Sequence, residues 1–325
     1  MVLAGGCRAL AFGILFGCAV NVVAQNIPRI GFIGATSQNT ISTRIAAFRQ
    51  GLKNLGYVEG KNIVVEYRWS EGRDERLATF AAELEQLRVA VIVTGGPLVT
   101  RVVRQATKST PIVMAFDSDP VSSGFVDSLA RPGGRITGLS VNAAEMSGKQ
   151  VDVLRQIIPG FSRLAVLGDS KEPSYAHSLE QIKHASAALG LRIQPLDVRA
   201  SHGIEEAFAA ARRERTQAMI VLPSAYLLLA RSEIVTQAEK QRLPVMYWAQ
   251  DYVDAGGLVS YSANIEDLYR RAAIYVDKIL KGAKPGELAV EQPYKFELVV
   301  SVKAAKRIGL TIPMSVLTRA DRVIQ

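Results

Sequence analysis

The sequence predicts an α/β protein with two lobes, each built on a parallel sheet. Short apolar runs of strand length alternate with amphipathic stretches of helix length from Arg29 onward, a pattern typical of repeated strand–helix–strand units. The alternation passes through two successive halves of similar length, which meet near Asn142. The chain has 325 residues, of which 48% are hydrophobic and 21% are charged, as expected for a globular protein of two lobes.

In the first half, the predicted strands are apolar runs that end at glycine, proline or small polar residues: Arg29–Gly34, Asn62–Tyr67, Val89–Thr94, Ile112–Phe116 and Ile136–Ser140. Between them, apolar residues recur at helical spacing. This spacing predicts helices over Thr40–Gly56, from near Asp74 to Leu87, and over Leu98–Lys108. A further short amphipathic helix is predicted after Pro120, with one face formed by Phe125, Val126 and Leu129.

The second half repeats this order. Its predicted helices are Ala143–Ile158, Ser174–Leu189, Gly203–Glu214 and Tyr226–Gln241, and its predicted strands are Arg163–Gly168, Arg192–Asp197, Ala218–Leu222, Val245–Tyr247 and Leu258–Tyr261. A long helix over Ile265–Leu280 then packs on one of the lobes. It is followed by a loop over Lys281–Gly286 and a late strand over Phe296–Ser301.

The first 24 residues are predicted to be a signal peptide. A single charge, Arg8, precedes an apolar run over Ala9–Gly17, and Val22–Ala24 ends in small residues before Gln25. The apolar run is shorter than the about 20 residues that span a bilayer. We expect cleavage after Ala24 and export to the periplasm, in preference to a buried N-terminal helix.

A second cleavage interpretation places a lipobox over Leu15–Cys18, which would anchor the protein through a lipid on Cys18. Phe16 is atypical in such a motif, so this alternative is less favoured. Cys7 and Cys18 are the two cysteines of the chain and both precede Gln25. The mature protein therefore needs no oxidative folding.

The net charge of +9 and the pI near 9.6 do not predict nucleic-acid binding. Basic residues are dispersed, without a run of five and without an aromatic-studded RNA motif. The mature chain without Arg8 keeps +8 (9 minus 1). A generally basic exported surface explains this charge.

Motifs for catalysis, cofactor binding or metal binding are missing, so we expect no enzyme, no cofactor and no metal. The segment Gly56–Asn62 looks superficially like a phosphate-binding loop, but it has three residues between its glycines where that motif has four, and Asn62 in place of Ser or Thr. A helix end and turn explain it better. The histidines His177, His184 and His202 have no metal-ligand spacing.

Small or polar residues follow nearly every predicted strand, where open α/β sheets place ligands. They are Thr36, Ser37, Gly95, Gly96, Ser118, Asp119, Ser140, Asp169, Ser170, Ser224 and Asp251. Loops of any α/β protein contain such residues, so no single position identifies a site. The second half adds aromatic residues near the same strand ends: Tyr175, Tyr226, Tyr247, Trp248 and Tyr261. Together they predict a cleft with stacking faces and a few oriented polar groups.

Several ordered motifs resemble one bacterial family over about residues 29–324. They are Gly56–Asn62 with Val65–Arg68, Asp119–Val121, Ser128–Gly134, Ile136–Ser140, Ala255–Tyr261, Asp267–Ala272, Val276–Gly282, and Glu291–Pro293 with Lys295–Leu298. The sequence is similar to the ABC transporter substrate-binding proteins that are often described as tryptophan/tyrosine transport system binding proteins.

This resemblance implies a type I periplasmic-binding-protein fold, in which two Rossmann-like lobes with parallel sheets are joined by three crossovers and hold the ligand between them. It implies an N-terminal lobe of residues 28–142 plus 263–292, and a C-terminal lobe of residues 143–262 plus 293–325. The first crossover is expected near Asn142. The helix Ile265–Leu280 should return to the first lobe, and the strand at Phe296 to the second.

Members of the family hold an amino acid by its amino and carboxylate groups while aromatic residues cover its side chain. On matching positions, the resemblance implies ligand contacts at Ser37, Gly96, Pro97, Ser118, Asp119, Ser140, Asp169, Ser224, Trp248 and Asp251. Relatives can carry an acidic residue just after the proline at position 223, where this chain has Ser224. We therefore expect Asp119, Asp169 or Asp251 to accept the amine of such a ligand.

The expected function is that of an exported, monomeric solute-binding protein. It would deliver a small ligand, such as an aromatic or other amino acid, to an ABC permease in the inner membrane. A ligand-sensing partner that docks on a signalling protein stays open as an alternative. A transcription factor of the same fold is disfavoured, because 28 residues precede the first strand, whereas a helix-turn-helix domain needs about 50–60. A flavodoxin-like enzyme is disfavoured by the missing motifs.

Overall fold

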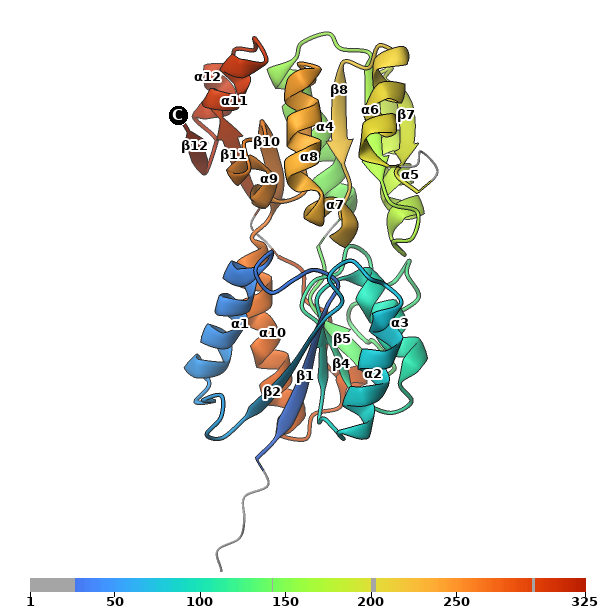
Figure 1. Cartoon of the computed structure of the whole chain (residues 1–325), viewed down its shortest axis with the longest axis vertical. Coiled ribbons are helices and arrows are strands. Elements are labelled where there is room, and N and C mark those ends of the chain that lie inside the picture. Colours follow the sequence, from blue (N-terminus) through green and yellow to red (C-terminus); the bar gives the residue numbers. More distant parts are fainter. Residues whose placement is uncertain (1–26, 142, 200–202, 294–295) are drawn as a thin grey trace, which may run out of the picture.

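The computed structural model describes residues 27–141, 143–199, 203–293 and 296–325, which form two lobes stacked end to end (Figure 1). The predicted signal peptide, Cys18 and the first crossover at Asn142 lie outside the described residues.

The N-terminal lobe is built on a parallel sheet with the strand order β2-β1-β3-β4-β5. Its strands are β1 (Arg29–Gly34), β2 (Val64–Trp69), β3 (Ile92–Thr94), β4 (Ile112–Met114) and β5 (Ile136–Gly138). The order reverses between β1 and β3, which is the kind of switch point that opens a crevice beyond the strand ends. The loops after β1 and β3 therefore border a potential ligand site.

Helices cover both faces of this sheet because alternate residues of its strands are apolar on both sides. Phe32 of β1 packs in one cluster with Phe48 of α1 (Ser42–Asn54) and Tyr269 of α10 (Ile265–Leu280). The neighbouring Ile33 packs in another cluster with residues of α2 (Arg76–Gln86) and α3 (Pro97–Ala106). Figure 1 shows α1 beside α10 on one side of the lobe and α2 with α3 on the other.

The C-terminal lobe contains a longer sheet with the order β12-β11-β10-β9-β8-β6-β7. Its strands are β6 (Arg163–Gly168), β7 (Arg192–Asp197), β8 (Ala218–Val221), β9 (Val245–Tyr247), β10 (Val259–Ala263), β11 (Phe296–Ser301) and β12 (Arg322–Ile324). A second switch point lies between β6 and β8. The predicted parallel arrangement holds except at β10 and β11, which pair antiparallel.

The helices of this lobe are α4 (Ala143–Ile157), α5 (Tyr175–Ala187), α6 (Ile204–Arg213), α7 (Ala225–Leu229), α8 (Arg231–Lys240), α9 (Gln250–Asp254), α11 (Val302–Arg307) and α12 (Met314–Leu317). The prediction of one helix over Tyr226–Gln241 is wrong, because the chain turns at Ala230 and separates α7 from α8. The short elements α9, α11, α12 and β12 were not predicted.

The helix predicted after Pro120 is also wrong. The segment forms successive turns, in which the peptide N–H groups of Phe125 and Val126 both bond to the carbonyl of Pro120. Gly124 adopts a positive φ of 69°, which a right-handed helix cannot contain. The apolar residues that suggested a helix are buried in the lobe, as Phe125 and Val126 show, but they are held there by turns.

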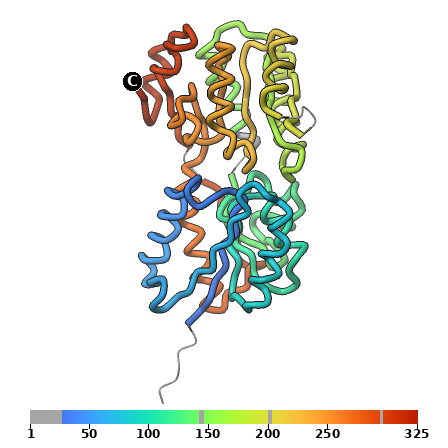
Figure 2. The backbone as a smooth tube through the Cα atoms, in the orientation of Figure 1, coloured from blue at the N-terminus to red at the C-terminus, as the bar shows by residue number. Residues whose placement is uncertain are grey.

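Successive parts of the chain lie alternately in the two lobes, so the chain passes between them three times. After the first passage it builds the second sheet as far as β10. It then returns through α10, seen in Figure 2 as an orange segment beside the blue α1, and through the 3₁₀ helix η1 (Pro285–Glu287). Glu291 bridges to Leu139 in the first lobe before β11 joins the second sheet. The predicted fold class of two Rossmann-like lobes joined by three crossovers is confirmed.

Candidate ligand-binding cleft

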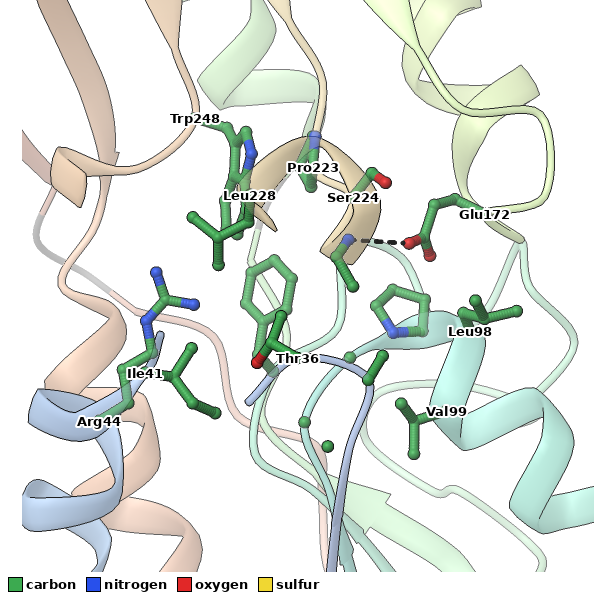
Figure 3. Close-up of a pocket in the computed structure, with 17 residues that line it drawn as sticks. Thr36, Ile41, Arg44, Leu98, Val99, Glu172, Pro223, Ser224, Leu228 and Trp248 are labelled. Atoms are coloured by element: carbon green, nitrogen blue, oxygen red, sulfur yellow. Dashed lines mark hydrogen bonds between the residues drawn. The ribbon is translucent and has the colours of Figure 1, made fainter. Parts of the chain in front are cut away.

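A cavity lies between the lobes at the carboxyl ends of their strands (Figure 3). The N-terminal lobe supplies the residues that follow β1 and β3, together with Ile41 and Arg44 of α1 and Phe116 after β4. The C-terminal lobe supplies Glu172, Pro223, Ser224, Ala225, Leu228 and Trp248. Both switch points therefore open onto one shared cavity.

The cavity is narrow, with a volume of about 30 Å³. This is room for a few water molecules. A molecule of amino-acid size can enter only when the lobes separate. Lobe separation is the usual way in which two-lobed proteins with hinges admit a ligand.

An aromatic pair crosses the cavity. The rings of Phe116 and Trp248 stack with centroids 5.6 Å apart and planes 28° apart. Each ring comes from a loop of a different lobe, and both are buried. The guanidinium carbon of Arg44 lies 5.6 Å from the Trp248 ring centroid, within cation–π range. These groups form an apolar, polarisable wall that suits a flat ligand side chain.

Arg44 brings a positive charge to one side of the cavity (Figure 3). It lies on the inward face of α1 and is only 3% exposed. Burial acts to lower the pKa of Arg44, but Asp251, Tyr269 and Glu266 together outweigh burial and the net shift is upward. Nη2 of Arg44 donates a 2.5 Å hydrogen bond to Oδ2 of Asp251, across the lobes. Arg44 thus stays charged within the cleft.

Glu172 brings a carboxyl group to the opposite side of the cavity (Figure 3). Its Oε1 accepts a 3.2 Å hydrogen bond from the N–H of Ala225. Its Oε2 is buried and has no hydrogen-bond partner among the described residues. Burial raises the pKa of Glu172 to about 7, against the opposing influence of the Ala225 and Leu98 peptide N–H groups.

The start of α3 faces this carboxyl group from the other lobe. Gly96 precedes the helix and Pro97 is its first residue, so the N–H groups of Leu98 and Val99 have no acceptor within the helix. The partial positive charge of a helix N-terminus favours an anion. The N-terminal lobe therefore contributes the Arg44 guanidinium and the start of α3 to the cavity, and the C-terminal lobe contributes the Glu172 carboxyl group.

A second buried carboxyl group, Asp117, lies just behind the cavity wall. Burial raises its pKa well above the ordinary value, and the nearby charges of Asp119 and Glu172 add to the effect. Oδ1 accepts the N–H of Asp119 at 2.9 Å, whereas Oδ2 lacks a partner within the described part of the chain.

The structure brings four of the predicted contact residues to the cavity wall: Gly96, Pro97, Ser224 and Trp248. The hydroxyl of Ser224 caps α7 and donates to Oδ2 of Asp169 at 3.2 Å.

The other six predicted residues lie around this wall and form their own contacts. Asp169 is held by Nε and Nη2 of Arg199 at 2.8 and 2.9 Å, and Asp251 by Arg44. Asp119 pairs with Nε2 of His177 at 3.0 Å. The hydroxyl of Ser37 bonds to that of Thr40, that of Ser140 to the carbonyl of Val141, and Ser118 is buried.

Thr36, named from its place after the first strand, lines the wall, whereas sequence reasoning missed Arg44, Phe116, Glu172 and Leu228 as wall residues. Arg44 carried a usable signal, because it is a charged residue on the apolar stripe formed by Ile41, Ile45 and Phe48. Glu172 offered none, since its loop is acidic and polar like many others.

Two further features bear on the class of protein. Within the described ranges, no cluster of three or more His, Cys, Asp or Glu side chains is arranged to hold a metal ion. No helix in the same ranges is long and apolar enough to cross a membrane.

Similarity to known proteins agrees with this geometry. The family model of the ABC transporter substrate binding protein matches residues 29–324. A tyrosine-binding protein of Clostridioides difficile (strain R20291) is 19% identical over 322 residues, covering 95% of this chain and 91% of that protein.

Solved structures superpose closely. The ABC domain from Streptococcus pneumonia in complex with L-Trp has a TM-score of 0.86 and 25% identity, covering 91% of this chain and 99% of that one. A conserved domain protein from Vibrio cholerae O1 biovar eltor has a TM-score of 0.86 and 26% identity with the same coverage. The fold, the interlobe cavity and the match over residues 29–324 lead to one conclusion: the chain belongs to the ABC transporter substrate binding protein family.

Proposed function

We propose that this substrate-binding protein captures an amino acid, with an aromatic side chain preferred, and delivers it to an ABC permease in the inner membrane. The observation that carries the proposal is the pairing of Phe116 with Trp248 between a buried guanidinium and a buried carboxyl group. A flat side chain can stack against these rings once the lobes separate, and a zwitterion suits a cavity that carries groups of both charges. The names of the relatives, which mention tyrosine and L-Trp, support the same ligand class.

In this proposal the ligand carboxylate lies toward Gly96 and Pro97 at the start of α3, where the N–H groups of Leu98 and Val99 have no acceptor within the helix. Trp248 covers the side chain, and Ser224 offers a hydroxyl. The remaining predicted contacts are Ser37, Ser118, Asp119, Ser140, Asp169 and Asp251. Five of them have partners that must move or share them before they reach a ligand, whereas the hydroxyl of Ser118 is buried without a hydrogen-bond partner among the described residues.

We further propose that the protein acts by binding alone, as a monomer in the periplasm, after cleavage between Ala24 and Gln25. N-terminal sequencing of the exported protein tests the cleavage site. A lipid found on Cys18 would contradict it and would place the protein on the membrane surface.

The ligand class is tested by calorimetry on the mature protein with L-tryptophan, L-tyrosine, L-phenylalanine and L-leucine, and with D-galactose as a neutral control. We expect the aromatic amino acids to bind most tightly. Native mass spectrometry of protein purified from its own periplasm identifies any ligand that is retained. Binding of galactose without any amino acid would overturn the proposed class.

Closure around the ligand is tested by small-angle scattering. Saturation with the amino acid that binds should decrease the radius of gyration, because we expect the ligand-free protein to open part of the time and the bound ligand to hold the lobes together. An unchanged radius at saturation would contradict binding between the lobes.

A further inference from the structure

The carboxyl group of Glu172 is a buried acid with no ion-pair partner among the described residues, and the N–H groups of Ala225 and Leu98 and the charge of Arg101 only partly offset its burial. The residue is 5% exposed and lines the cavity. One oxygen accepts the Ala225 N–H, and the other has no hydrogen-bond partner among the described residues. A buried carboxylate in this condition is costly to maintain.

The cations around Glu172 are bonded to other groups. Arg199 holds Asp169 with two hydrogen bonds. Arg101 of α3 donates to the carbonyl of Lys171 at 2.8 Å, and Nζ of Lys171 lies 3.4 Å from Oδ2 of Asp74. Burial has the largest influence on the pKa of Glu172, which the charge of Asp169 raises and that of Arg101 lowers, and Glu172 in turn raises the pKa of Asp117.

Asp169 provides an internal comparison. Its side chain is 1% exposed, yet both of its oxygens are bonded to Arg199, and Ser224 adds a third hydrogen bond. Two buried acids therefore lie near each other in the same lobe. One is neutralised within the protein, and the other faces the cavity with an oxygen unpaired.

We propose that Glu172 is the residue that accepts the ammonium group of the cleft ligand and so selects amines over otherwise similar acids. This inference rests on the proposed function and extends it to the group that recognises the amine. An ammonium placed at Oε2 would supply the missing donor and the missing positive charge together. The raised pKa of Glu172 agrees with an acid that awaits a cation.

Paired ligands that differ only in the amine test the assignment. L-tryptophan is compared with indole-3-propionate, and L-tyrosine with 3-(4-hydroxyphenyl)propionate, by calorimetry at pH 8. Wild type should bind the amino acids at least about tenfold more tightly. Glu172→Gln should weaken the amino acids by about 30-fold or more and leave the propionates nearly unchanged. Glu180→Gln, an exposed acid of α5 that pairs with Lys183, is the control and should change neither.

Failure of this assignment is distinct from failure of the proposed function. If wild type prefers the amino acids and Glu172→Gln keeps that preference, another group binds the amine, and the ligand class stands. If wild type prefers the propionates, both proposals are wrong.

A measurement without ligand decides the case in which no amino acid binds. At pH 8, Glu172→Gln should raise the melting temperature, because it removes a buried charge that the surrounding groups offset only in part. A higher melting temperature of the variant would show that the carboxylate destabilises the protein, as expected for a group that serves binding. A fall would show that it is structural and would overturn the assignment.

Discussion

Arg44 donates a 2.5 Å hydrogen bond to Asp251, and this ion pair joins α1 of one lobe to α9 of the other. Among the described residues, three further pairs cross the same boundary: His177 with Asp119 at 3.0 Å, and Asp74 with Lys171 at 3.4 Å and with Arg199 at 3.9 Å. Arg44 and Asp251 are the most buried of these pairs. Separation of the lobes must break it, so it favours the closed arrangement.

Asp251→Asn should shift the protein toward an open arrangement, because the neutral amide attracts Arg44 less strongly than the carboxylate does. Small-angle scattering should show a larger radius of gyration than for wild type. Asp254→Asn on the same helix is the matched control, since Asp254 pairs with Arg322 in an exposed contact within one lobe. Equal radii for Asp251→Asn and wild type would show that this pair does not hold the lobes together.

Trp248→Ala should weaken binding of an aromatic amino acid by about 1–3 kcal/mol, since it removes one face of the aromatic wall. Calorimetry with L-tryptophan measures the loss. Phe80→Ala is the control, because Phe80 lies on α2 under the guanidinium of Arg76 and does not line the cavity. An equal loss in both variants would point to a general loss of structure.

The free energy of unfolding should depend on pH because of Glu172. Its folded pKa of about 7 is above the ordinary value of 4.5, so the native state binds the proton more tightly than the unfolded state. This group's contribution to stability is therefore present at low pH and is lost as pH rises from about 4.5 to about 7. Urea unfolding should find wild type and Glu172→Gln similar at pH 5. At pH 8 the variant should be more stable by about 3 kcal/mol. A difference that does not change with pH would contradict this.

Asp169→Asn should destabilise the C-terminal lobe by about 2–3 kcal/mol, because Arg199 loses a bidentate carboxylate partner that is almost fully buried. Glu206→Gln should cost less than about 0.5 kcal/mol, since its pair with Arg213 is more than half exposed. Urea unfolding compares the two. Equal losses would mean that burial does not set the strength of the Asp169 pair.

Gly51→Ala should destabilise the N-terminal lobe by about 1–3 kcal/mol. A Cβ at Gly51 of α1 would lie 2.3 Å from the Arg270 carbonyl oxygen of α10 and 2.9 Å from Cβ of Ala273. Backbone atoms cannot yield there, so the two helices must move apart. At Gly148 of α4 a Cβ meets nothing within 4 Å, so Gly148→Ala should stabilise by about 0.5–1 kcal/mol. Thermal unfolding of both variants checks the contrast.

Local signals predicted most of the elements. The helix Ile265–Leu280 was predicted with the bounds that the structure has, because Asn264 caps its start and its apolar face is regular. The antiparallel pairing of β11 could not be predicted from its residues. It depends on the direction in which the chain re-enters the lobe after Glu291, which is a property of the whole path.

The sequence predicted where the cleft lies better than it predicted which side chains line the cleft. Residues such as Gly96 and Trp248 follow strands and line the cavity. Side chains farther from strand ends were missed, as with Arg44, since a helix must be docked before its inward residues are known. The sequence directed attention to position 224 for an acid, whereas the structure places the Glu172 carboxyl group against the N–H of the next residue, Ala225.

The return of α10 to the first lobe affects how the molecule is assembled. Tyr269 and Ala273 of this helix complete packing against Phe32 and Gly51, more than 200 residues earlier in the chain. As the chain emerges from its N-terminus, α1 alone covers that side of the first sheet until the second lobe has largely been made. The second sheet in turn waits for β11 and β12. Neither lobe is encoded by one continuous piece of gene, so neither can be excised or exchanged as such.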